Sequence, residues 1–399
     1  MAQKIFIVNT GSASKKYALY GDGEREFYAH FEKENGGFIV NFVKGEAREK
    51  RAVSDSDYAG ATLYAIKKMT DEGLIGGAGD ITAIGLRIVA PGEYFTENRP
   101  VDAEFSKRLD EAKEWAPLHA ISIISEIENL GAALPGVPIF AVSDSAYHSA
   151  MPSHSRYYGL PLDDAEKFGV VRFGYHGISF KSVLPKLESL SRVSADKAIF
   201  CHLGSGSSIM ALKDGKSFDT SMGFSPLEGV PMSTRVGDID AGAVVYLEKK
   251  SGFSPEEAEN YFNSRCGLLG LSGKTGDVRE LLNLEAAGDE RAALALEIFV
   301  YKIKKYIGSY FAALGGADVL IFSGTIGERS PIIRSRICRG LESLGIVIDG
   351  ERNNGVQSAD GFIHHETDSP VKIAVIVSDE MGQMASETAL ALRSAAGGL

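Results

Sequence analysis

The sequence predicts an α/β protein built from two related halves around a central cleft, and two observations support this. Residues 4–14 (KIFIVNTGSAS) align without gaps with residues 197–207 (KAIFCHLGSGS), about half a chain later. Each copy has the pattern of a buried strand, a Gly/Ser turn and a returning strand. Further β-rich runs alternate with stretches of helical periodicity, which is typical of layered α/β folds. We therefore expect a duplicated fold with its functional site in the cleft.

The remaining elements follow in order along the chain. Apolar residues recur at three- and four-residue steps over residues 290–314, which predicts a long helix. A last helix is expected over about residues 380–396, with Ser378 or Asp379 as its cap. β-Rich runs that precede polar or turn residues predict further strands at 81–89, 137–142, 319–322 and 373–377.

Composition narrows the classes of function. The 399 residues are 44% apolar and 24% charged, as in an ordinary globular protein of two or three domains. A net charge of −11 disfavours nucleic acid and anionic membranes as partners. The apolar N-terminal run ends at Asn9, so neither a signal peptide nor a membrane span is expected. Cys201, Cys266 and Cys338 form no disulfide or zinc pattern, which favours the cytoplasm.

Three Gly/Ser turns follow predicted strands, at residues 10–14, 202–208 and 323–330. Small residues allow backbone N–H groups to approach an anion closely, so each turn could cradle phosphate. Each could equally be a tight structural turn that needs glycine. Because ligands of α/β folds lie beyond the carboxyl ends of strands, three such turns together favour a nucleotide site.

Four isolated side chains could carry chemistry. Arg87 ends a predicted strand and Arg235 lies in the stretch 231–240, and a guanidinium suits carboxylate and phosphate oxygens. Asp144 follows another predicted strand, and His176 lies in the stretch 173–179. The alternative interpretations are surface ion pairs for the two arginines, a helix cap for Asp144 and a structural role for His176. Spacing alone does not choose between these interpretations and a functional site.

Eleven segments, in the same order, resemble the acetokinase family of the acetate and sugar kinase/Hsp70/actin superfamily. The stretches DTSMGFSPLEG and TRVGDID are the most specific, and together the segments span nearly the whole chain. They are residues 8–16, 87–89, 116–119, 144–152, 175–177, 201–204, 219–229, 234–240, 267–273, 323–328 and 378–380.

The resemblance implies two actin-like (ribonuclease H-like, βββαβαβα) domains around the cleft. The last helix would return to the first domain, so the expected domains are residues 1–148 with 382–399, and residues 149–381. The implied activity is reversible, Mg²⁺-dependent transfer of the ATP γ-phosphoryl group to acetate, giving acetyl phosphate and ADP. Mn²⁺ could replace Mg²⁺, and a cytoplasmic homodimer is the implied assembly.

The resemblance also assigns roles to matching positions. The implied catalytic residues are Asp144, His176 and Arg235. The implied metal-associated residues are Asn9 and Glu380. The implied substrate-binding residues are Arg87, Val89, Leu118, Tyr175 and Pro226. The implied nucleotide-binding residues are Lys16, His202, Leu203, Gly204, Ser205, Gly206, Asp277, Val278, Arg279, Thr325, Ile326, Gly327, Glu328 and Arg329.

Several positions depart from the family's pattern. Ser205 and Arg329 replace asparagines, Tyr175 replaces a phenylalanine, and Thr325 replaces a glycine. Because a β-branched residue opposes positive φ, Thr325 could narrow the adenosine pocket, which would favour pyrophosphate as donor. A propionate or butyrate kinase and a non-catalytic actin/Hsp70-like nucleotide-binding protein are further alternatives. The sequence also leaves open the direction of the reaction and the redox sensitivity of Cys201.

Overall fold

The computed structural model describes residues 3–11, 14–34, 36–114, 117–191 and 196–397. The chain divides into two compact units, Met1–Ala146 with Asp379–Leu399, and Tyr147–Ser378. The sequence had placed these boundaries at 148/149 and 381/382. Across the described ranges, none of the helices combines the length and the apolar character that crossing a membrane requires.

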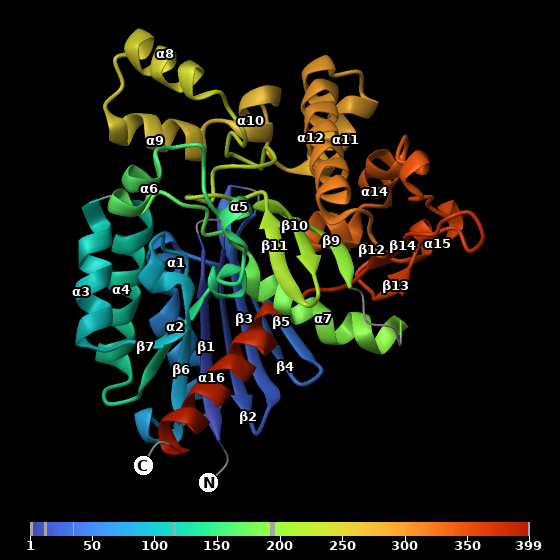
Figure 1. The fold of residues 1–399 in the computed structure, drawn as a ribbon. Helices are drawn as coiled ribbons and strands as arrows, with labels where there is room; N and C mark the ends of the chain where they lie inside the picture. The colour runs from blue at the N-terminus through green and yellow to red at the C-terminus, as the bar shows by residue number, and fades with distance from the viewer. Residues whose placement is uncertain (1–2, 12–13, 35, 115–116, 192–195, 398–399) are drawn as a thin grey trace. The chain divides into compact units, whose positions relative to one another are not determined.

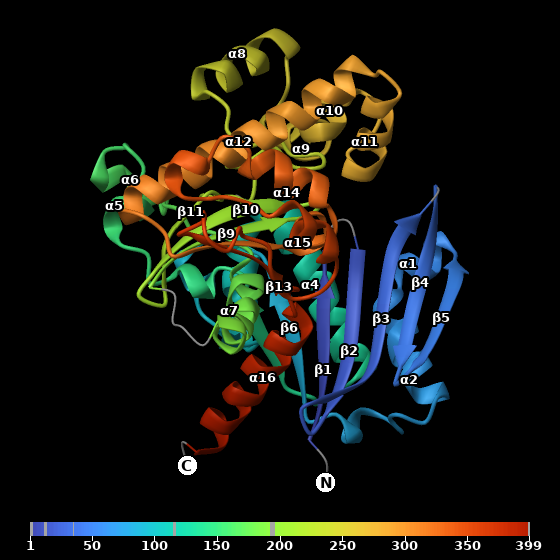
Figure 2. The same cartoon turned by 90° about the vertical axis from the view of Figure 1, so that its right-hand side faces the viewer.

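The first unit is built on one mixed sheet in the order β5-β4-β3-β2-β1-β6-β8-β7. Figure 1 draws β1 to β5 of this sheet in blue. β1, β2 and β3 pair antiparallel, whereas β6 pairs parallel with both β1 and β8. Figure 2 shows β3, β4 and β5 side by side at one edge of this sheet. The strands are β1 (Lys4–Thr10), β2 (Ser14–Gly21), β3 (Glu24–Glu34), β4 (Gly37–Lys44), β5 (Ala47–Val53), β6 (Ala83–Ile88), β7 (Arg99–Pro100) and β8 (Ile139–Ser143).

Helices cover both faces of the central strands, because these strands are apolar at nearly every position. Phe6 and Val8 point into a core with α2 and α4, whereas Ile7 and Gly85 face α16. A Cβ atom on Gly85 would lie 2.3 Å from Thr388 Oγ1 of α16, so glycine permits this close packing. The helices of this unit are α1 (Asp55–Ala59), α2 (Ala61–Asp71), α3 (Ala103–Glu111), α4 (Pro117–Ala133) and α16 (Glu380–Gly397).

The second unit repeats the central part of this topology, with the order β11-β10-β9-β12-β14-β13. In each sheet, three antiparallel strands are followed by two parallel ones, which is the arrangement of the actin-like fold. The strands are β9 (Lys197–Leu203), β10 (Ser207–Lys213), β11 (Lys216–Thr220), β12 (Val319–Ser323), β13 (Gly361–Phe362) and β14 (Lys372–Val375).

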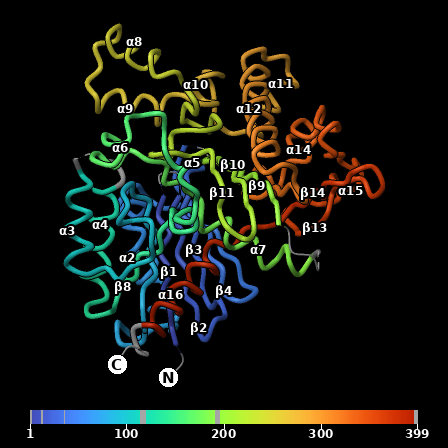
Figure 3. The backbone as a smooth tube through the Cα atoms, in the orientation of Figure 1, coloured from blue at the N-terminus to red at the C-terminus, as the bar shows by residue number. Residues whose placement is uncertain are grey.

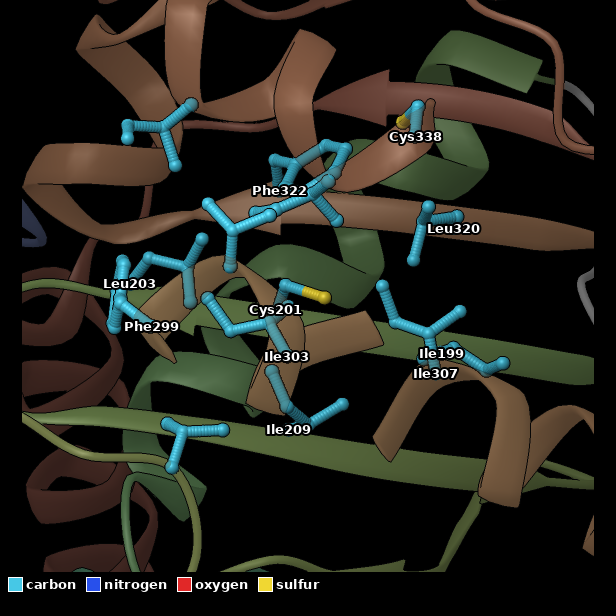
Figure 4. Packing of buried hydrophobic residues seen from close by; sticks show 14 of the residues in the cluster. Ile199, Cys201, Leu203, Ile209, Phe299, Ile303, Ile307, Leu320, Phe322 and Cys338 are labelled. Carbon is cyan, nitrogen blue, oxygen red and sulfur yellow. The ribbon is translucent and has the colours of Figure 1, made fainter. Parts of the chain in front are cut away.

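The core of the second unit lies between its sheet and α12. Figure 4 shows Phe299 and Ile303 of α12 packed among side chains from β9, β10 and β12, with Cys201 and Cys338 in the same cluster. A smaller cluster joins Phe180 of α7 to the opposite face. The helices are α5 (Ser153–Arg156), α6 (Leu162–Phe168), α7 (Gly177–Ser191), α8 (Ala241–Ser251), α9 (Pro255–Ser264), α10 (Gly267–Ser272), α11 (Val278–Ala286), α12 (Glu290–Leu314), α13 (Gly324–Arg329), α14 (Pro331–Cys338) and α15 (Gly350–Gly355).

The repeat predicted from the sequence is confirmed. Both copies form a strand, a turn and an antiparallel returning strand, and Asn9 and His202 occupy equivalent positions near the ends of the first strands. The predicted helix at 290–314 is confirmed, and α16 begins at Glu380 as expected. Asp379 is its cap, because Asp379 Oδ1 accepts a 3.0 Å hydrogen bond from Gly382 N.

Candidate functional site

In the first unit, three predicted site residues lie at one edge of the sheet. β1, β6 and β8 run parallel, so their carboxyl ends meet at that edge. Asn9 lies near the end of β1, Arg87 near the end of β6, and Asp144 directly after β8. Glu380 joins them as the first residue of α16. Strand register thus gathers residues that are far apart in sequence.

These four side chains form a continuous hydrogen-bonded chain. Glu380 Oε2 accepts from Asn9 Nδ2 at 3.0 Å, and Asn9 Oδ1 accepts from Arg87 Nη1 at 3.3 Å. Arg87 Nη2 donates to Asp144 Oδ2 at 2.8 Å. Asn9 is 4% exposed and Asp144 2% exposed, so the chain is held largely away from water. Two carboxylates and one guanidinium leave it with an excess of negative charge.

Arg87 is held charged and keeps one donor unused. Burial lowers the pKa of Arg87, but the nearby carboxylates of Asp144 and Glu380 outweigh burial and raise that pKa above its ordinary value. Arg87 Nε is buried and has no hydrogen-bond partner within the described part of the chain. A buried N–H without a partner is costly, so Arg87 is held in this position by its other contacts and not by its Nε.

In the second unit, two histidine rings lie against each other, tilted by 33°, beside a glycine turn. The ring centroids of His176 and His202 lie 4.3 Å apart. His176 Nδ1 is 2.9 Å from Ser208 Oγ, and His202 Nδ1 is 2.8 Å from Ser179 Oγ. His176 also has a φ of 61°, which is uncommon for a residue other than glycine. Such backbone strain persists where surrounding contacts impose it, often at functional sites.

Arg235 approaches the same turn as His176. A Cβ atom on Gly206 would lie 3.2 Å from His176 Nε2 and 3.6 Å from Arg235 Nη1, so both side chains border this glycine. Arg235 Nη1 also donates to the carbonyl oxygen of Pro226 at 3.3 Å. The structure therefore brings together a guanidinium, an imidazole and a turn with two glycines, a combination suited to phosphoryl oxygens.

The loop that carries Arg235 rests on α10. The N–H groups of Leu268 and Leu269 donate to the carbonyl oxygens of Met232 and Ser233, at 2.8 and 2.9 Å. A Cβ atom on Gly267, whose φ is 58°, would lie 2.2 Å from Met232 O. Glycine at position 267 is therefore required for the close approach of the two backbones.

The segment 219–229 is held by hydrogen bonds and an ion pair from side chains that were not predicted from the sequence. Arg172 Nη2 pairs with Glu228 Oε1 at 2.7 Å, and Arg172 Nη1 donates to the carbonyl oxygens of Thr220 and Met222. Tyr158 Oη donates to Glu228 Oε2 and accepts from Phe224 N at 2.8 Å. No sequence signal marks these partners, because they precede the motif by tens of residues.

The predicted substrate-pocket residues come from both units. Val89 is half-buried in the first unit, and the side chain of Leu118 lies outside the described residues. Tyr175 and Pro226 belong to the second unit. The Tyr175 side chain is buried, and its hydroxyl donates to the carbonyl oxygen of Phe224 at 2.8 Å. Tyr175, where the family usually has phenylalanine, thus holds the segment that contains Pro226 through this hydrogen bond.

The predicted nucleotide-binding residues lie on three segments of the second unit and on one strand of the first. His202, Leu203, Gly204, Ser205 and Gly206 span the end of β9 and its turn, with Ser205 exposed. Asp277 caps α11, and its pKa is lowered chiefly by hydrogen bonding from Arg279. Val278 is buried in the core. Lys16 lies on β2 in the first unit.

The structure corrects the argument about Thr325. The family's glycine at the position of Thr325 predicts either a positive φ or a close backbone approach there. Instead, Gly324 has a φ of 75°, and a Cβ atom there would lie 2.7 Å from Leu203 O. Thr325 lies in the helical turn α13 and is exposed, so its branched side chain is not under backbone strain. Ile326, Gly327, Glu328 and Arg329 complete α13.

The duplicated sheet order, with predicted site residues beyond strand ends in each unit, places the chain among proteins of the actin-like fold. The family model for the acetokinase family matches residues 4–386. The chain belongs to this family.

Relatives and solved structures agree. An acetate kinase of Bacillus mycoides is 40% identical over 392 residues, which cover 94% of this chain and 96% of the relative. The crystal structure of Porphyromonas gingivalis acetate kinase has a TM-score of 0.84 at 32% identity, covering 98% of this chain and 100% of that one. A propionate kinase structure from Francisella tularensis has a TM-score of 0.86 at 33% identity, with 97% and 99% covered.

Proposed function

We propose that the protein transfers the γ-phosphoryl group of ATP to acetate, reversibly, giving acetyl phosphate and ADP. The observation that carries this proposal is Arg87, a guanidinium near the carboxyl edge of the sheet whose charge the carboxylates of Asp144 and Glu380 support. Such a guanidinium suits the carboxylate of a small acid. Curated relatives named acetate kinase, about 40% identical over 94% of the chain, support the same reaction.

The acceptor needs no general base. A carboxylic acid of ordinary pKa is already ionised near pH 7, so its oxygen can attack phosphorus directly. Asp144 then acts by holding the Arg87 guanidinium, which it contacts at 2.8 Å. Arg87 in turn binds and orients the acetate carboxylate. Fixed orientation lowers the barrier because less motion is lost at the moment of reaction.

Arg235 and His176 are the proposed partners of the transferring phosphoryl group. In-line transfer spreads negative charge over the equatorial oxygens, which positioned donors stabilise. The Gly206 turn leaves room for those oxygens beside both side chains. We assign the nucleotide to the segments 202–206, 277–279 and 325–329, with Lys16 as a further phosphate contact.

Asn9 and Glu380 are the proposed magnesium-associated residues. Amide and carboxylate oxygens are ligands that Mg²⁺ accepts, and Mg²⁺ is commonly held by only one or two carboxylates together with substrate phosphates. The negative excess of the chain Glu380–Asn9–Arg87–Asp144 suits a divalent cation, and Mn²⁺ would accept the same oxygens. When bound, the ion would neutralise phosphate charge and orient the donor.

ATP is the proposed donor, and the backbone supports it: the positive φ that a branched side chain would oppose falls on Gly324, whereas Thr325 is helical. For the acceptor, Val89, Leu118, Tyr175 and Pro226 are the proposed apolar contacts of the acetate methyl group. Because a methylene group is worth only about 1–3 kcal/mol, propionate is the acceptor to compare with acetate.

We further propose that the two compact units are the two domains, and that the protein is a cytoplasmic homodimer. α8 contributes no buried residue in the described chain, and its Val245 and Tyr246 are 47% and 60% exposed. We take these exposed apolar side chains as the candidate contact between copies. Light scattering should give a dimer mass, and Tyr246→Glu should shift that mass toward the monomer.

The reaction is tested by trapping acetyl phosphate as its hydroxamate. Purified protein would receive Mg²⁺, ATP or pyrophosphate as donor, and acetate, propionate or butyrate as acceptor. Product from ATP and acetate is expected. Product with pyrophosphate alone would contradict ATP as the donor. A preference for propionate or butyrate would contradict acetate as the acceptor. The absence of any product would favour a non-catalytic nucleotide-binding protein.

A further inference from the structure

Glu328 is a buried carboxylate whose partners are unusual. It lies in α13 and is 8% exposed. Its Oε1 accepts three hydrogen bonds, from Gly324 N at 2.9 Å, Ser378 N at 3.1 Å and Ser378 Oγ at 3.2 Å. A buried carboxylate needs such donors, because desolvation strongly disfavours its charge. Glu328 therefore faces the protein interior, although the sequence analysis placed it among the nucleotide contacts.

Capping of α13 accounts for only one of these bonds. A carboxylate that reaches back four residues to Gly324 N would satisfy the first turn of its own helix. The other two donors belong to Ser378, which is 50 residues further along the chain. The geometry thus ties the turn at 324–329 to a distant segment through one side chain.

Ser378 is the point at which the chain leaves the second unit. The second unit ends at Ser378, and the next residue, Asp379, begins the returning part of the first unit. Figure 3 traces this passage from β14 into α16. Asp379 caps α16, and Glu380 accepts the hydrogen bond from Asn9. Three consecutive residues therefore lead from the Glu328 carboxylate to the pair proposed to hold magnesium.

We propose that Glu328 is a positioning residue that couples nucleotide binding at 324–329 to the placement of Glu380. This rests on the proposed function, because it takes α13 as part of the nucleotide site. A nucleotide that orders α13 holds the Glu328 carboxylate in place. Through its hydrogen bonds, this carboxylate holds Ser378, and Ser378 in turn limits the motion of the first residues of α16. Two sites linked in this way show a coupling free energy, typically equivalent to a 5–150-fold change in affinity.

Hydrogen exchange tests the coupling without metal or turnover. The full-length protein would be compared with and without ADP in EDTA, following peptides that cover 324–329 and 377–383. In the wild type, ADP should slow exchange in both peptides. Glu328→Gln keeps the size of the side chain but removes its charge and weakens its hydrogen bonds. In this variant the first peptide should stay protected, whereas protection of the second should fall about fivefold.

Ser378→Ala provides a second variant that leaves α13 untouched. It removes one donor to Glu328 and should produce the same selective loss at 377–383. Glu342→Gln is the matched control, because Glu342 is an exposed carboxylate of the same unit that accepts from Gly340 N. That control should exchange like the wild type in both states. Equal ADP protection of 377–383 in wild type and both test variants would overturn the proposal.

The Mg²⁺ dependence of activity is an independent test of the coupling. Glu328→Gln and Ser378→Ala should raise the free Mg²⁺ needed for half-maximal activity about fivefold, with the acetate KM within about twofold of wild type. A fall in Tm with unchanged Mg²⁺ dependence would show a merely structural role and contradict the coupling. If the wild type made no acetyl phosphate, the proposed function would fail, whereas the exchange experiment would still decide the coupling.

Discussion

The hydroxyl of Tyr175 donates a 2.8 Å hydrogen bond to the carbonyl oxygen of Phe224. Phe224 lies two residues before Pro226, whose own carbonyl oxygen accepts from Arg235. The bond therefore joins a proposed wall of the acyl pocket to the segment that holds a proposed catalytic arginine. A phenylalanine at position 175 would fill nearly the same volume without this tether.

Tyr175→Phe should loosen the segment around Phe224 and reduce acyl selectivity. The ratio of kcat/KM for acetate to kcat/KM for propionate is expected to fall roughly fivefold, which corresponds to about 1 kcal/mol of transition-state discrimination. Loss of the hydrogen bond should lower the free energy of unfolding by about 1 kcal/mol. Steady-state kinetics with both acids measures the ratio. Tyr147→Phe is the control, because the Tyr147 hydroxyl donates to Gly215 O on a distant hairpin; an equal effect there would refute a specific role for Tyr175.

Gly267→Ala should displace the loop that carries Arg235. The added methyl group would meet the carbonyl oxygens of Met232 and Arg235 at 2.2 and 2.6 Å, so one backbone must move. A misplaced catalytic group commonly costs about a hundredfold, and we expect kcat to fall by at least tenfold. Gly252→Ala is the matched control: its φ of 70° is similar, but nothing lies within 4 Å of the new atom. Equal losses of kcat would show that backbone strain alone is responsible.

Asp219 should make stability depend on pH. Burial raises the pKa of Asp219 from 3.8 to about 6, and Arg172 offsets this only in part. Folding therefore favours the protonated carboxyl, so its contribution to stability is complete below pH 3.8 and disappears as the pH rises through about 6. Asp219→Asn avoids this loss, and its stability relative to wild type should improve by up to about 3 kcal/mol between pH 4 and 7.

Urea unfolding at pH 4, 5.5 and 7 measures this difference. A difference between Asp219→Asn and wild type that is flat over this range would mean that Asp219 titrates normally.

Only one of the three cysteines should react in the folded protein. Cys201 and Cys338 are 0% and 1% exposed, and burial raises the pKa of each thiol, that of Cys338 to about 12. Because the thiolate is the reactive form, both should be inert. Ellman's reagent should therefore titrate one thiol, Cys266, under native conditions and three in urea. Rapid labelling of Cys201 in the native protein would instead identify it as a redox-sensitive residue.

The strands and helices with strong apolar patterns could be predicted from the sequence. α12 occupies the predicted residues, and β6, β8, β12 and β14 begin and end within two residues of the predicted bounds. β3, β4 and β5 were not predicted, because β5 is largely exposed and charged and its pattern resembles a loop. Their pairing with β2 depends on contacts that local pattern does not encode.

Site residues that lie within sequence motifs could be predicted. Partners that lie far from these motifs in the sequence could not. The Arg87–Asp144 pair follows from strand register, which places both at the carboxyl edge of one sheet. The Glu328–Ser378 link and the Arg172–Glu228 pair join residues 50 and 56 positions apart, so only the tertiary fold reveals them. Thr325 was misjudged because the preceding residue, Gly324, takes the positive φ.

Arg235→Ala tests the central claim, that an arginine beside the Gly206 turn stabilises the transferring phosphoryl group. Several kcal/mol of transition-state stabilisation should be lost, so kcat should fall by about a thousandfold while the acetate KM changes modestly. Arg339→Ala, which removes an exposed arginine of the same unit, should leave both constants unchanged. The measurement to make is the rate of acetyl phosphate formation over a range of acetate concentrations at saturating ATP. A fall in kcat at nearly constant KM is the predicted result, and a rise in KM alone with kcat preserved would contradict the account.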